Sequence, residues 1–361
     1  MAALKTITVR GFKSIRALED LELRNLNVLI GANGAGKSNF ISLFQMLAAL
    51  MDGRLQLWVQ EHDGPDALLF GTRKRTEQMD AEFSFGSNGY HLSLRPAGGR
   101  LIFAREDSLF YGDYVRESVH PYGSGHEEAL LRDVQDDRFA PWVQRSIKGW
   151  RVYHFHDTSG RAPMRHAQPV RDNLRLKPDA GNIAPFLRML FEDERNSYER
   201  IVETVRMIAP FFGDFVYREE PGERVELEWF QRNDPDTPFG PRQLSDGTLR
   251  FICLTTLLLQ PTYLQPDTIL IDEPELGLHP YALTILAGLL RQASERRQII
   301  VSTQSVELIN HFSPEDIVVV DRHDDASTFT RLNEEQLSQW LEDYALGEMW
   351  KMNVIGGRPT R

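Results

Sequence analysis

The segment Gly31-Ala-Asn-Gly-Ala-Gly-Lys-Ser38 decides the fold of this 361-residue chain. It matches the pattern G-x-x-x-x-G-K-[ST], in which a glycine-rich loop wraps phosphate groups. The loop follows Leu26–Ile30, a nearly all-apolar run typical of a strand buried on both faces. It precedes Lys37–Met51, where apolar residues recur at helical spacing. Strand, loop and helix in this order are the context that a phosphate-binding loop requires.

The residue types of the loop fit the chemistry of a nucleoside triphosphate. Glycines let backbone N–H groups approach the phosphates, and the start of the helix adds a positive dipole end. Lys37 is expected to reach the β- and γ-phosphates, and the Ser38 hydroxyl to bind Mg²⁺. We therefore predict ATP and Mg²⁺ as cofactors. The expected nucleotide contacts are Gly31, Asn33, Gly34, Gly36, Lys37, Ser38 and Asn39.

A second apolar run, Ile269–Ile271, ends in two acidic residues. Carboxylates at the carboxyl end of a buried strand lie where α/β sheets bind ligands. Asp272 is predicted to hold Mg²⁺, directly or through water, together with Ser38. Glu273 is predicted to orient and deprotonate the attacking water. An acidic pair that caps a following helix is the alternative interpretation of such a strand taken alone.

Leu244-Ser-Asp-Gly-Thr248 opens a predicted helix upstream of the acidic pair. Ser245 suits an ordinary helix N-cap, which is the alternative interpretation. Ser245, the Gly247 backbone and the helix N-terminus would also form a second anion-binding surface. The pentapeptide resembles the LSGGQ signature of ABC ATPases, in which the signature of one subunit faces the γ-phosphate held by the other. The resemblance implies a homodimer with ATP between two copies.

The resemblance extends along both ends of the chain. Gly11-Phe-Lys-Ser14 resembles the N-terminal strand region of SMC, RecF and OLD-type ATPases, and Glu275–Pro280 resembles their D-loop. Gln304 stands at the position of the switch residue, where many ABC proteins carry His. A glutamine can hydrogen-bond a γ-phosphate but cannot become cationic. With Lys37 and Glu273, Gln304 completes the predicted catalytic set.

Two further stretches resemble one bacterial group of small stand-alone ATPases without an assigned substrate. They are His154-Phe-His-Asp157 and the ending Leu346–Pro359. For the first stretch three interpretations stay open: a metal site, a loop that touches Mg²⁺ or the attacking water as a Q-loop does, or residues of structure only. Val318–Asp325 faintly resembles the acid pairs of TOPRIM nucleases, but we interpret it as a strand and turn and predict no nuclease.

The predicted fold class is α/β: a P-loop NTPase of the ABC-ATPase type with a mixed sheet, an antiparallel β lobe and an inserted helical and β middle region. Residues 1–50 and 240–361 are expected to form the ATPase core, and 51–239 the inserted lobe. Within the lobe, residues 80–105 alternate as an antiparallel meander. Residues 106–150 predict loop and a short helix, and Trp150–Phe155 a strand. Phe215–Tyr217 and Val225–Trp229 predict a hairpin around Pro221-Gly222.

Composition limits the partners and the location. The net charge is −11, so the overall field does not steer the chain to nucleic acid. The stretch Arg145–Lys177 nevertheless holds eight Lys or Arg against two Asp, which keeps local DNA contact open. One cysteine, Cys253, excludes an internal disulfide. No apolar run suits a membrane span or a signal peptide, so we expect a cytoplasmic protein without membrane contact.

The leading hypothesis is an ATPase that dimerises on ATP, hydrolyses it and passes its open and closed states to another molecule. Two outputs stay open: DNA ends or junctions in repair, and a nuclease-like effector protein in anti-phage defence. The alternatives are the ATPase subunit of an ABC transporter and a nucleotide-gated scaffold. The long separation of Lys37 from Leu244, the LSDGT signature and Gln304 oppose the transporter. Retention of Glu273 opposes the scaffold.

Overall fold

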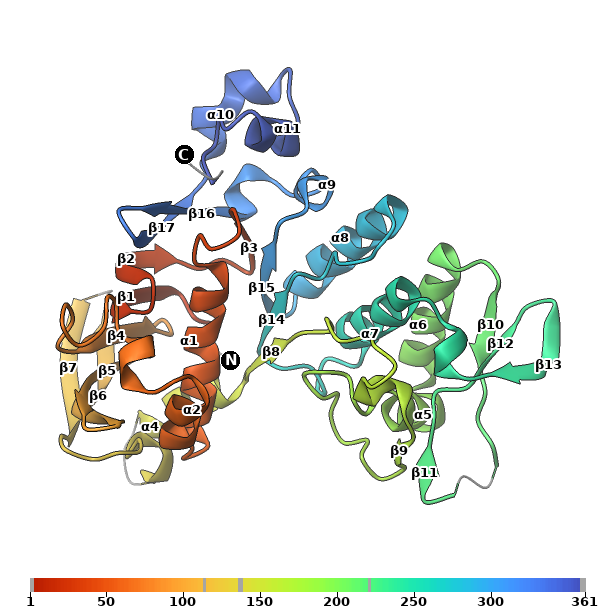
Figure 1. Cartoon of the computed structure of the whole chain (residues 1–361), viewed down its shortest axis with the longest axis horizontal. Helices are drawn as coiled ribbons and strands as arrows, with labels where there is room; N and C mark the ends of the chain where they lie inside the picture. The colour runs from red at the N-terminus through yellow and green to blue at the C-terminus, as the bar shows by residue number, and fades with distance from the viewer. Residues whose placement is uncertain (1–2, 113–114, 136–138, 220–221, 358–361) are drawn as a thin grey trace. The chain divides into compact units, whose positions relative to one another are not determined.

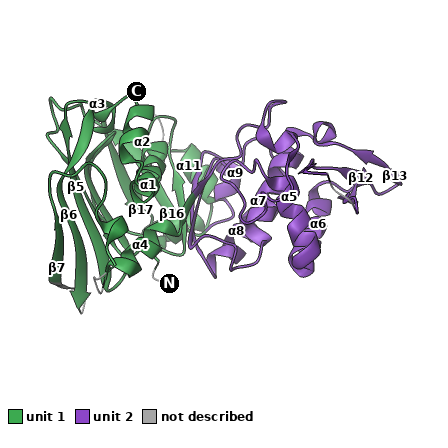
Figure 2. Cartoon of the chain, turned by 90° about the horizontal axis from the view of Figure 1, so that it is seen from below, with its two compact units in different colours: residues 1–151, 313–361 green, residues 152–312 purple. Residues whose placement is uncertain are grey.

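The computed structural model describes residues 3–112, 115–135, 139–219 and 222–357. The chain divides into two compact units, residues 1–151 with 313–361, and residues 152–312 (Figure 2). Each unit is described by itself. The predicted ATPase core (1–50 and 240–361) and inserted lobe (51–239) have other boundaries than these two units, and that division stays a prediction.

The first unit contains an antiparallel sheet of six strands in the order β2-β1-β4-β5-β6-β7 (Figure 1). Its strands are β1 (Thr6–Phe12), β2 (Ile15–Glu22), β4 (Met79–Ser84), β5 (Asn88–Ala97), β6 (Arg100–Gly112) and β7 (Val115–Gly123). The predicted meander over residues 80–105 is confirmed, since β4 pairs with β5 and β5 with β6 in antiparallel register. One face of this sheet is apolar and buried, with Phe83 and Phe85 near Trp150 at ring distances of 6.0 and 5.8 Å.

A second group of strands in this unit is mixed. β3 (Leu26–Ile30) runs parallel to β16 (Ile317–His323), and β16 runs antiparallel to β17 (Ala326–Arg331). This arrangement confirms the predicted mixed sheet. The helices of the unit are α1 (Lys37–Met51), α2 (Leu55–Glu61), α3 (Pro65–Leu68), α4 (Ala140–Lys148), α10 (Glu334–Leu341) and α11 (Leu346–Lys351). All five residues of β3 are buried, and α1 has the predicted bounds.

The second unit pairs β14 (Thr268–Asp272) in parallel with β15 (Gln298–Thr303). Its helices are α5 (Ile183–Asp193), α6 (Arg195–Ile208), α7 (Asp246–Leu259), α8 (Pro280–Ser294) and α9 (Val306–Ile309). α7 packs against α6 and α8 and is buried along almost its whole length. A small sheet in the order β10-β12-β13 completes the unit, with β10 (Phe212–Phe215), β12 (Trp229–Gln231) and β13 (Asp234–Phe239).

One prediction about the middle of the chain is wrong. Residues 106–150 are not mainly loop, because β6 continues to Gly112 and β7 follows. The alternation is hidden there because the polar residues Glu106, Asp107 and Ser108 are themselves buried. Glu106 accepts hydrogen bonds from the Tyr90 hydroxyl at 2.8 Å and from His126 at 2.8 Å, which makes its burial acceptable.

The predicted hairpin is confirmed in its pairing, since Phe215 of β10 lies opposite Trp229 of β12 and the Val216 N–H donates to the Glu228 carbonyl at 2.9 Å. The start of its second strand differs, because β11 (Arg224–Val225) pairs with β9 (Gln168–Pro169). Rings of Phe212, Phe215 and Trp229 cluster within 5.0 to 5.8 Å and select the observed partner. The expected turn residue Pro221 lies outside the described residues. The strand predicted to Phe155 is β8 (Trp150–Tyr153), and it ends where the His154 amide turns to the Pro178 carbonyl at 3.0 Å.

Candidate functional site

The glycine-rich loop lies between β3 and α1 in the first unit, as predicted. Lys37 is the first residue of α1, and its ammonium donates to the carbonyls of Gly31 at 2.6 Å and Ala32 at 3.1 Å. The side chain therefore lies back over the loop that encloses it. Gly34 and Gly36 have φ values of 77° and 121°, which L-residues rarely adopt. The loop thus has the left-handed turns that let consecutive N–H groups face one side.

Close neighbours explain why glycine stands at both ends of the loop. A Cβ on Gly31 would lie 2.2 Å from the Val320 carbonyl oxygen, and one on Gly36 would lie 2.1 Å from Ser327 Oγ. Both contacts are far below ordinary van der Waals separation. Since the backbone is held this tightly from behind, the loop is preorganised, and the space in front of it is a cradle for an anion.

Behind the loop, two hydroxyl groups and one amide group form a hydrogen-bond network that the sequence did not predict. Ser327 Oγ lies 2.5 Å from the Ala35 carbonyl and 2.7 Å from Ser14 Oγ, and the Asn39 amide donates to Ser14 Oγ at 2.7 Å. Ser14 belongs to the Gly11–Ser14 stretch, which carried a signal. Ser327 lies on β17, and nothing in its sequence context marks it. The predicted contact Asn39 thus points to this network.

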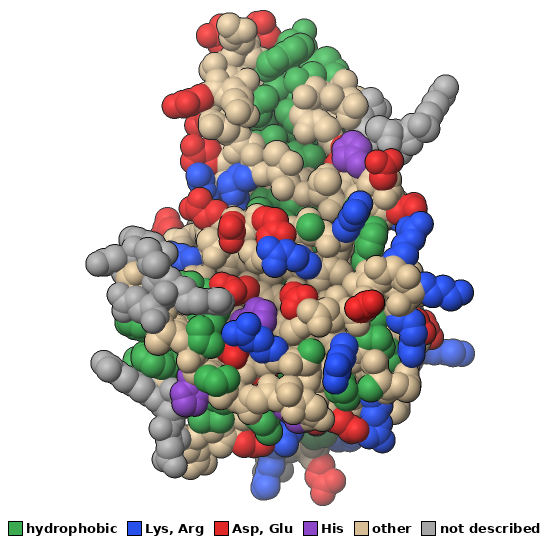
Figure 3. Space-filling model, turned by 90° about the vertical axis from the view of Figure 1, so that its left-hand side faces the viewer, with side chains coloured by type: hydrophobic (Ala, Val, Ile, Leu, Met, Phe, Trp, Pro, Cys, Tyr) green, Lys and Arg blue, Asp and Glu red, His purple; other side chains and the backbone are tan. Residues whose placement is uncertain are grey.

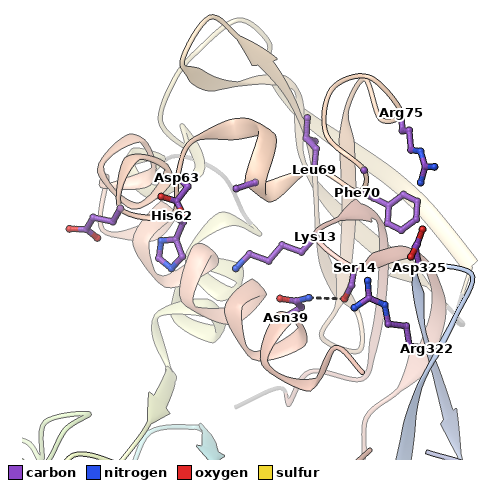
Figure 4. A pocket seen from close by; sticks show the side chains of 13 residues that line it. Lys13, Ser14, Asn39, His62, Asp63, Leu69, Phe70, Arg75, Arg322 and Asp325 are labelled. Carbon is purple, nitrogen blue, oxygen red and sulfur yellow. Dashed lines mark hydrogen bonds between the residues drawn. The ribbon is translucent and has the colours of Figure 1, made fainter. Parts of the chain in front are cut away.

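A pocket of about 620 Å³ opens beside the loop within the first unit (Figure 4). Lys13 extends into it and donates to Ser42 Oγ at 2.6 Å, and partial burial lowers the pKa of Lys13. Arg322 lines the same pocket and donates to the Gly34 carbonyl at 3.3 Å. Beside the glycine-rich loop, the lining thus combines cationic side chains and the Phe70 ring with the carboxylates of Glu61, Asp63 and Asp325. An aromatic ring of this kind can stack on a nucleobase.

Asp272, Glu273 and Gln304 lie together in the second unit. Asp272 ends β14, and Glu273 follows it with a φ of 44°, a strained value for a glutamate. The Gln304 amide nitrogen Nε2 donates to Glu273 Oε1 at 2.6 Å, and the Gln304 backbone N–H donates to Glu275 Oε1 at 2.8 Å. The structure therefore brings two of the predicted catalytic residues into direct contact. Ser38, the other predicted Mg²⁺ ligand, is exposed in the first unit.

The signature segment begins α7 in the same unit. Ser245 is its N-cap, and its Oγ accepts from the Thr248 N–H at 3.1 Å, so the helix-cap interpretation holds for this side chain. Gly247 is pressed against the D-loop, because a Cβ there would lie 2.3 Å from the Gly277 carbonyl oxygen. The Arg165 guanidinium binds the Asp246 carboxylate at 2.6 Å and the Thr158 carbonyl at 2.6 Å. The N-terminus of α7 is thereby fixed from two sides.

The His154-Phe-His-Asp157 stretch contacts the acidic strand end. His156 Nε2 donates to the Asp272 backbone carbonyl at 2.8 Å. His154 and His156 are both exposed, with ring centroids 6.4 Å apart. Within the described residues no group of three or more His, Cys, Asp or Glu side chains is arranged to hold a metal ion. The contact with Asp272 favours a supporting role at the acidic strand end.

The basic stretch Arg145–Lys177 is not one continuous cationic surface. Arg165 is buried, and Lys177 is paired with Asp172. Figure 3 shows a different part of the surface, the side that faces left in Figure 1, and there too Lys and Arg side chains lie among Asp and Glu side chains. The motif therefore gives no strong support for contact with a nucleic-acid backbone. Across the described residues, no helix combines the length and apolarity that crossing a bilayer requires.

Comparison with protein families decides the family of the chain. Residues 26–310 match the model of the family described as "AAA domain, putative AbiEii toxin, Type IV TA system". The chain belongs to this family. Comparison with curated proteins gives no match.

Solved structures agree on the fold. An SMC head domain bound to the C-winged helix domain of ScpA is similar with a TM-score of 0.61 at 15% identity, over 93% of this chain and 99% of that one. An SMC head domain with an extended coiled coil, bound to the C-terminal domain of ScpA derived from Pyrococcus furiosus, gives a TM-score of 0.56 at 13% identity, over 95% and 99%. The family member thus has the fold of a P-loop ABC-type ATPase of the SMC-like group, which confirms the predicted fold class and resemblance.

Proposed function

We propose that this AAA-domain protein binds and hydrolyses ATP, and that two copies close around the nucleotide. The observation that carries the proposal is the preorganised loop, in which Lys37 lies over the carbonyls of Gly31 and Ala32 and a Cβ on Gly31 or Gly36 would collide. Such a loop offers backbone N–H groups and a lysine to phosphate groups, and its backbone has no space to adopt another conformation. The adjoining pocket with Lys13 and Phe70 would receive the nucleoside.

Hydrolysis would rest on the second unit. Glu273 would accept the proton of the attacking water, and Gln304, bonded to it at 2.6 Å, would orient that carboxylate and sense the γ-phosphate. Ser38 and Asp272 offer oxygen ligands of the kind that Mg²⁺ prefers, and the ion would supply charge neutralisation on the phosphates.

Dimerisation follows from the signature segment. Ser245, Gly247 and the N-terminus of α7 form an anion-binding surface, and Arg165 and the D-loop hold it in place. We propose that this surface closes on the γ-phosphate bound by the second copy. The output would be a partner protein, a nuclease-like effector in anti-phage defence, since no nuclease site is predicted in the chain. DNA as the output is the second outcome to be tested.

The experiment compares Lys37→Ala and Glu273→Gln with the wild type and with Glu295→Gln, which removes an exposed carboxylate at the end of α8. Nucleotide binding is measured by calorimetry, turnover by phosphate release and association by sedimentation. Lys37→Ala should lose ATP binding. Glu273→Gln should keep binding, lose turnover and accumulate dimers with ATP, and Glu295→Gln should match the wild type. Unchanged affinity in Lys37→Ala, or normal turnover in Glu273→Gln, would refute the assignment.

A further inference from the structure

A half-buried glutamate in the D-loop has no role in the function proposed above. Glu275 is half-buried in the second unit with its Oε2 shielded from solvent, and this partial burial raises the pKa of its carboxyl group. Its Oε1 accepts the backbone N–H of Gln304 at 2.8 Å. A carboxyl group loses hydration when it is buried, so a specific partner is needed to keep it there. That partner is the switch residue itself.

The same switch residue joins two carboxylates. Its backbone N–H is bonded to Glu275, and its side-chain amide is bonded to Glu273 Oε1 at 2.6 Å. The hydrogen bond to Glu275 fixes the position of the Gln304 backbone. The backbone position in turn determines whether the side-chain amide of Gln304 can reach Glu273. Glu273 is itself constrained, with a φ of 44° and its N–H bonded to the Ser302 carbonyl at 2.8 Å.

The residue after Glu275 is tied to the signature helix. Arg250 of α7 is buried, and its guanidinium donates to the carbonyls of Leu276, Phe155 at 2.8 Å and His156 at 3.1 Å. His156 in turn donates to the Asp272 carbonyl at 2.8 Å. One arginine thus connects α7 to the D-loop and, through His156, to the end of β14. All of these contacts lie within the second unit.

We infer that Glu275 is a positioning residue that sets Gln304 against Glu273, and that Arg250 makes this setting respond to the position of the signature helix. This inference rests on the proposed function and deepens it by naming how the site is regulated. When the signature surface of one copy closes on the nucleotide of the other, any shift of α7 moves the Leu276 carbonyl. The neighbouring Glu275 then carries the shift to Gln304 and so to Glu273.

The first measurement needs no nucleotide. Hydrogen exchange of the Gln304 amide is compared in wild type, Glu275→Ala, Glu275→Gln and the control Glu307→Ala, which removes an exposed carboxylate on α9. The amide should be protected in the wild type and the control. Glu275→Ala should lose that protection, whereas Glu275→Gln should keep it because an amide oxygen still accepts the bond. Equal protection in wild type and Glu275→Ala would overturn the positioning role.

The second measurement separates positioning from binding. Glu275→Ala should lower kcat roughly 10- to 100-fold with the KM for ATP unchanged, because a misplaced group affects the chemical step. Glu275→Gln should recover most of that loss. A parallel rise in KM, or an alanine variant as fast as the wild type, would contradict the inference. If the wild type itself shows no turnover while the Gln304 amide follows the expected pattern, the proposed hydrolysis fails and the positioning contact stands.

The third measurement tests the link to α7. Arg250→Met and Arg250→Lys are compared with Arg296→Met, which removes an exposed arginine just after α8. Both Arg250 variants should keep ATP affinity and lose the acceleration of turnover that rising protein concentration gives. The double variant Arg250→Met with Glu275→Ala should be no slower than Glu275→Ala alone, because both changes break one chain of contacts. Multiplicative losses would show that the two residues act independently and would overturn the link.

Discussion

Replacing Gly247 by alanine tests the contact between the signature helix and the D-loop without any assumption about activity. A Cβ at this position would lie 2.3 Å from the Gly277 carbonyl oxygen. Ordinary carbon–oxygen contacts begin above 3 Å, so the two backbones must separate by roughly 1 Å, and overpacking of this kind costs about 1–3 kcal/mol. The separation is resisted, because Gly277 has a φ of 70° and Arg250 holds the neighbouring Leu276 carbonyl.

The matched control is the same substitution at Gly288, inside α8. No atom lies within 4 Å of a Cβ placed there, so alanine should only add helix propensity, about 0.5–1 kcal/mol. The two variants should therefore differ by about 1.5–4 kcal/mol. For a unit of this size each kcal/mol shifts the midpoint of thermal unfolding by roughly 2–4 °C.

The assay is thermal unfolding of the nucleotide-free protein, followed by circular dichroism. Gly288→Ala should unfold slightly above the wild type, and Gly247→Ala clearly below it. Equal midpoints for the two alanine variants would show that Gly247 is not pressed on Gly277, and the link between the signature helix and the D-loop would then rest on Arg250.

Two further predictions concern association and chemistry. Ser245→Arg should keep ATP affinity and lose turnover, because the large cationic side chain blocks the anion-binding surface presented to the other copy. Calorimetry measures the affinity and phosphate release the turnover. A fully active variant would argue against a shared site. Burial raises the pKa of the Cys253 thiol to about 12, which leaves roughly a thousandth of the usual thiolate at pH 8. Since the folded state favours the protonated thiol, its stability should fall as pH rises above the ordinary thiol pKa. At pH 8 a disulfide reagent should label Cys253 only as fast as the protein unfolds, and immediate stoichiometric labelling of native protein would contradict this.

The parts of the fold that the sequence predicted well are those with an uninterrupted apolar period. β3 and α1 have the predicted bounds because every residue of β3 is buried and the apolar residues that recur at helical spacing along α1 are buried too. β2 carries no such signal, since its buried residues recur at every third position beside an irregular register with β1. β6 is missed beyond residue 105 because Glu106 and Asp107 are buried through specific hydrogen bonds, and a strand with buried charges does not alternate.

The candidate site divides in the same manner. The loop residues and Glu273 were predictable because each belongs to a short motif with a chemical reason for every position. Ser327, Arg165 and Arg250 were not, since each acts through backbone carbonyls brought near by the fold. Every residue has a backbone carbonyl, so the sequence does not indicate which carbonyl a side chain will contact. The position of Gln304 directly after a strand was predictable, but its backbone bond to Glu275 was not.

The residues that contact the glycine-rich loop from behind determine which fragment of this protein should be expressed. The family match begins at residue 26 and ends at residue 310, which invites a fragment with those limits. Ser14, Val320 and Ser327 lie outside it, and they lie against Asn39, Gly31 and Ala35 from behind the loop. Such a fragment would also remove β16 from β3 and leave that edge of β3 unpaired and open to aggregation. Expression trials should therefore include the residues on both sides of the family match. Otherwise an inactive, aggregating fragment will be mistaken for a protein that does not bind nucleotide.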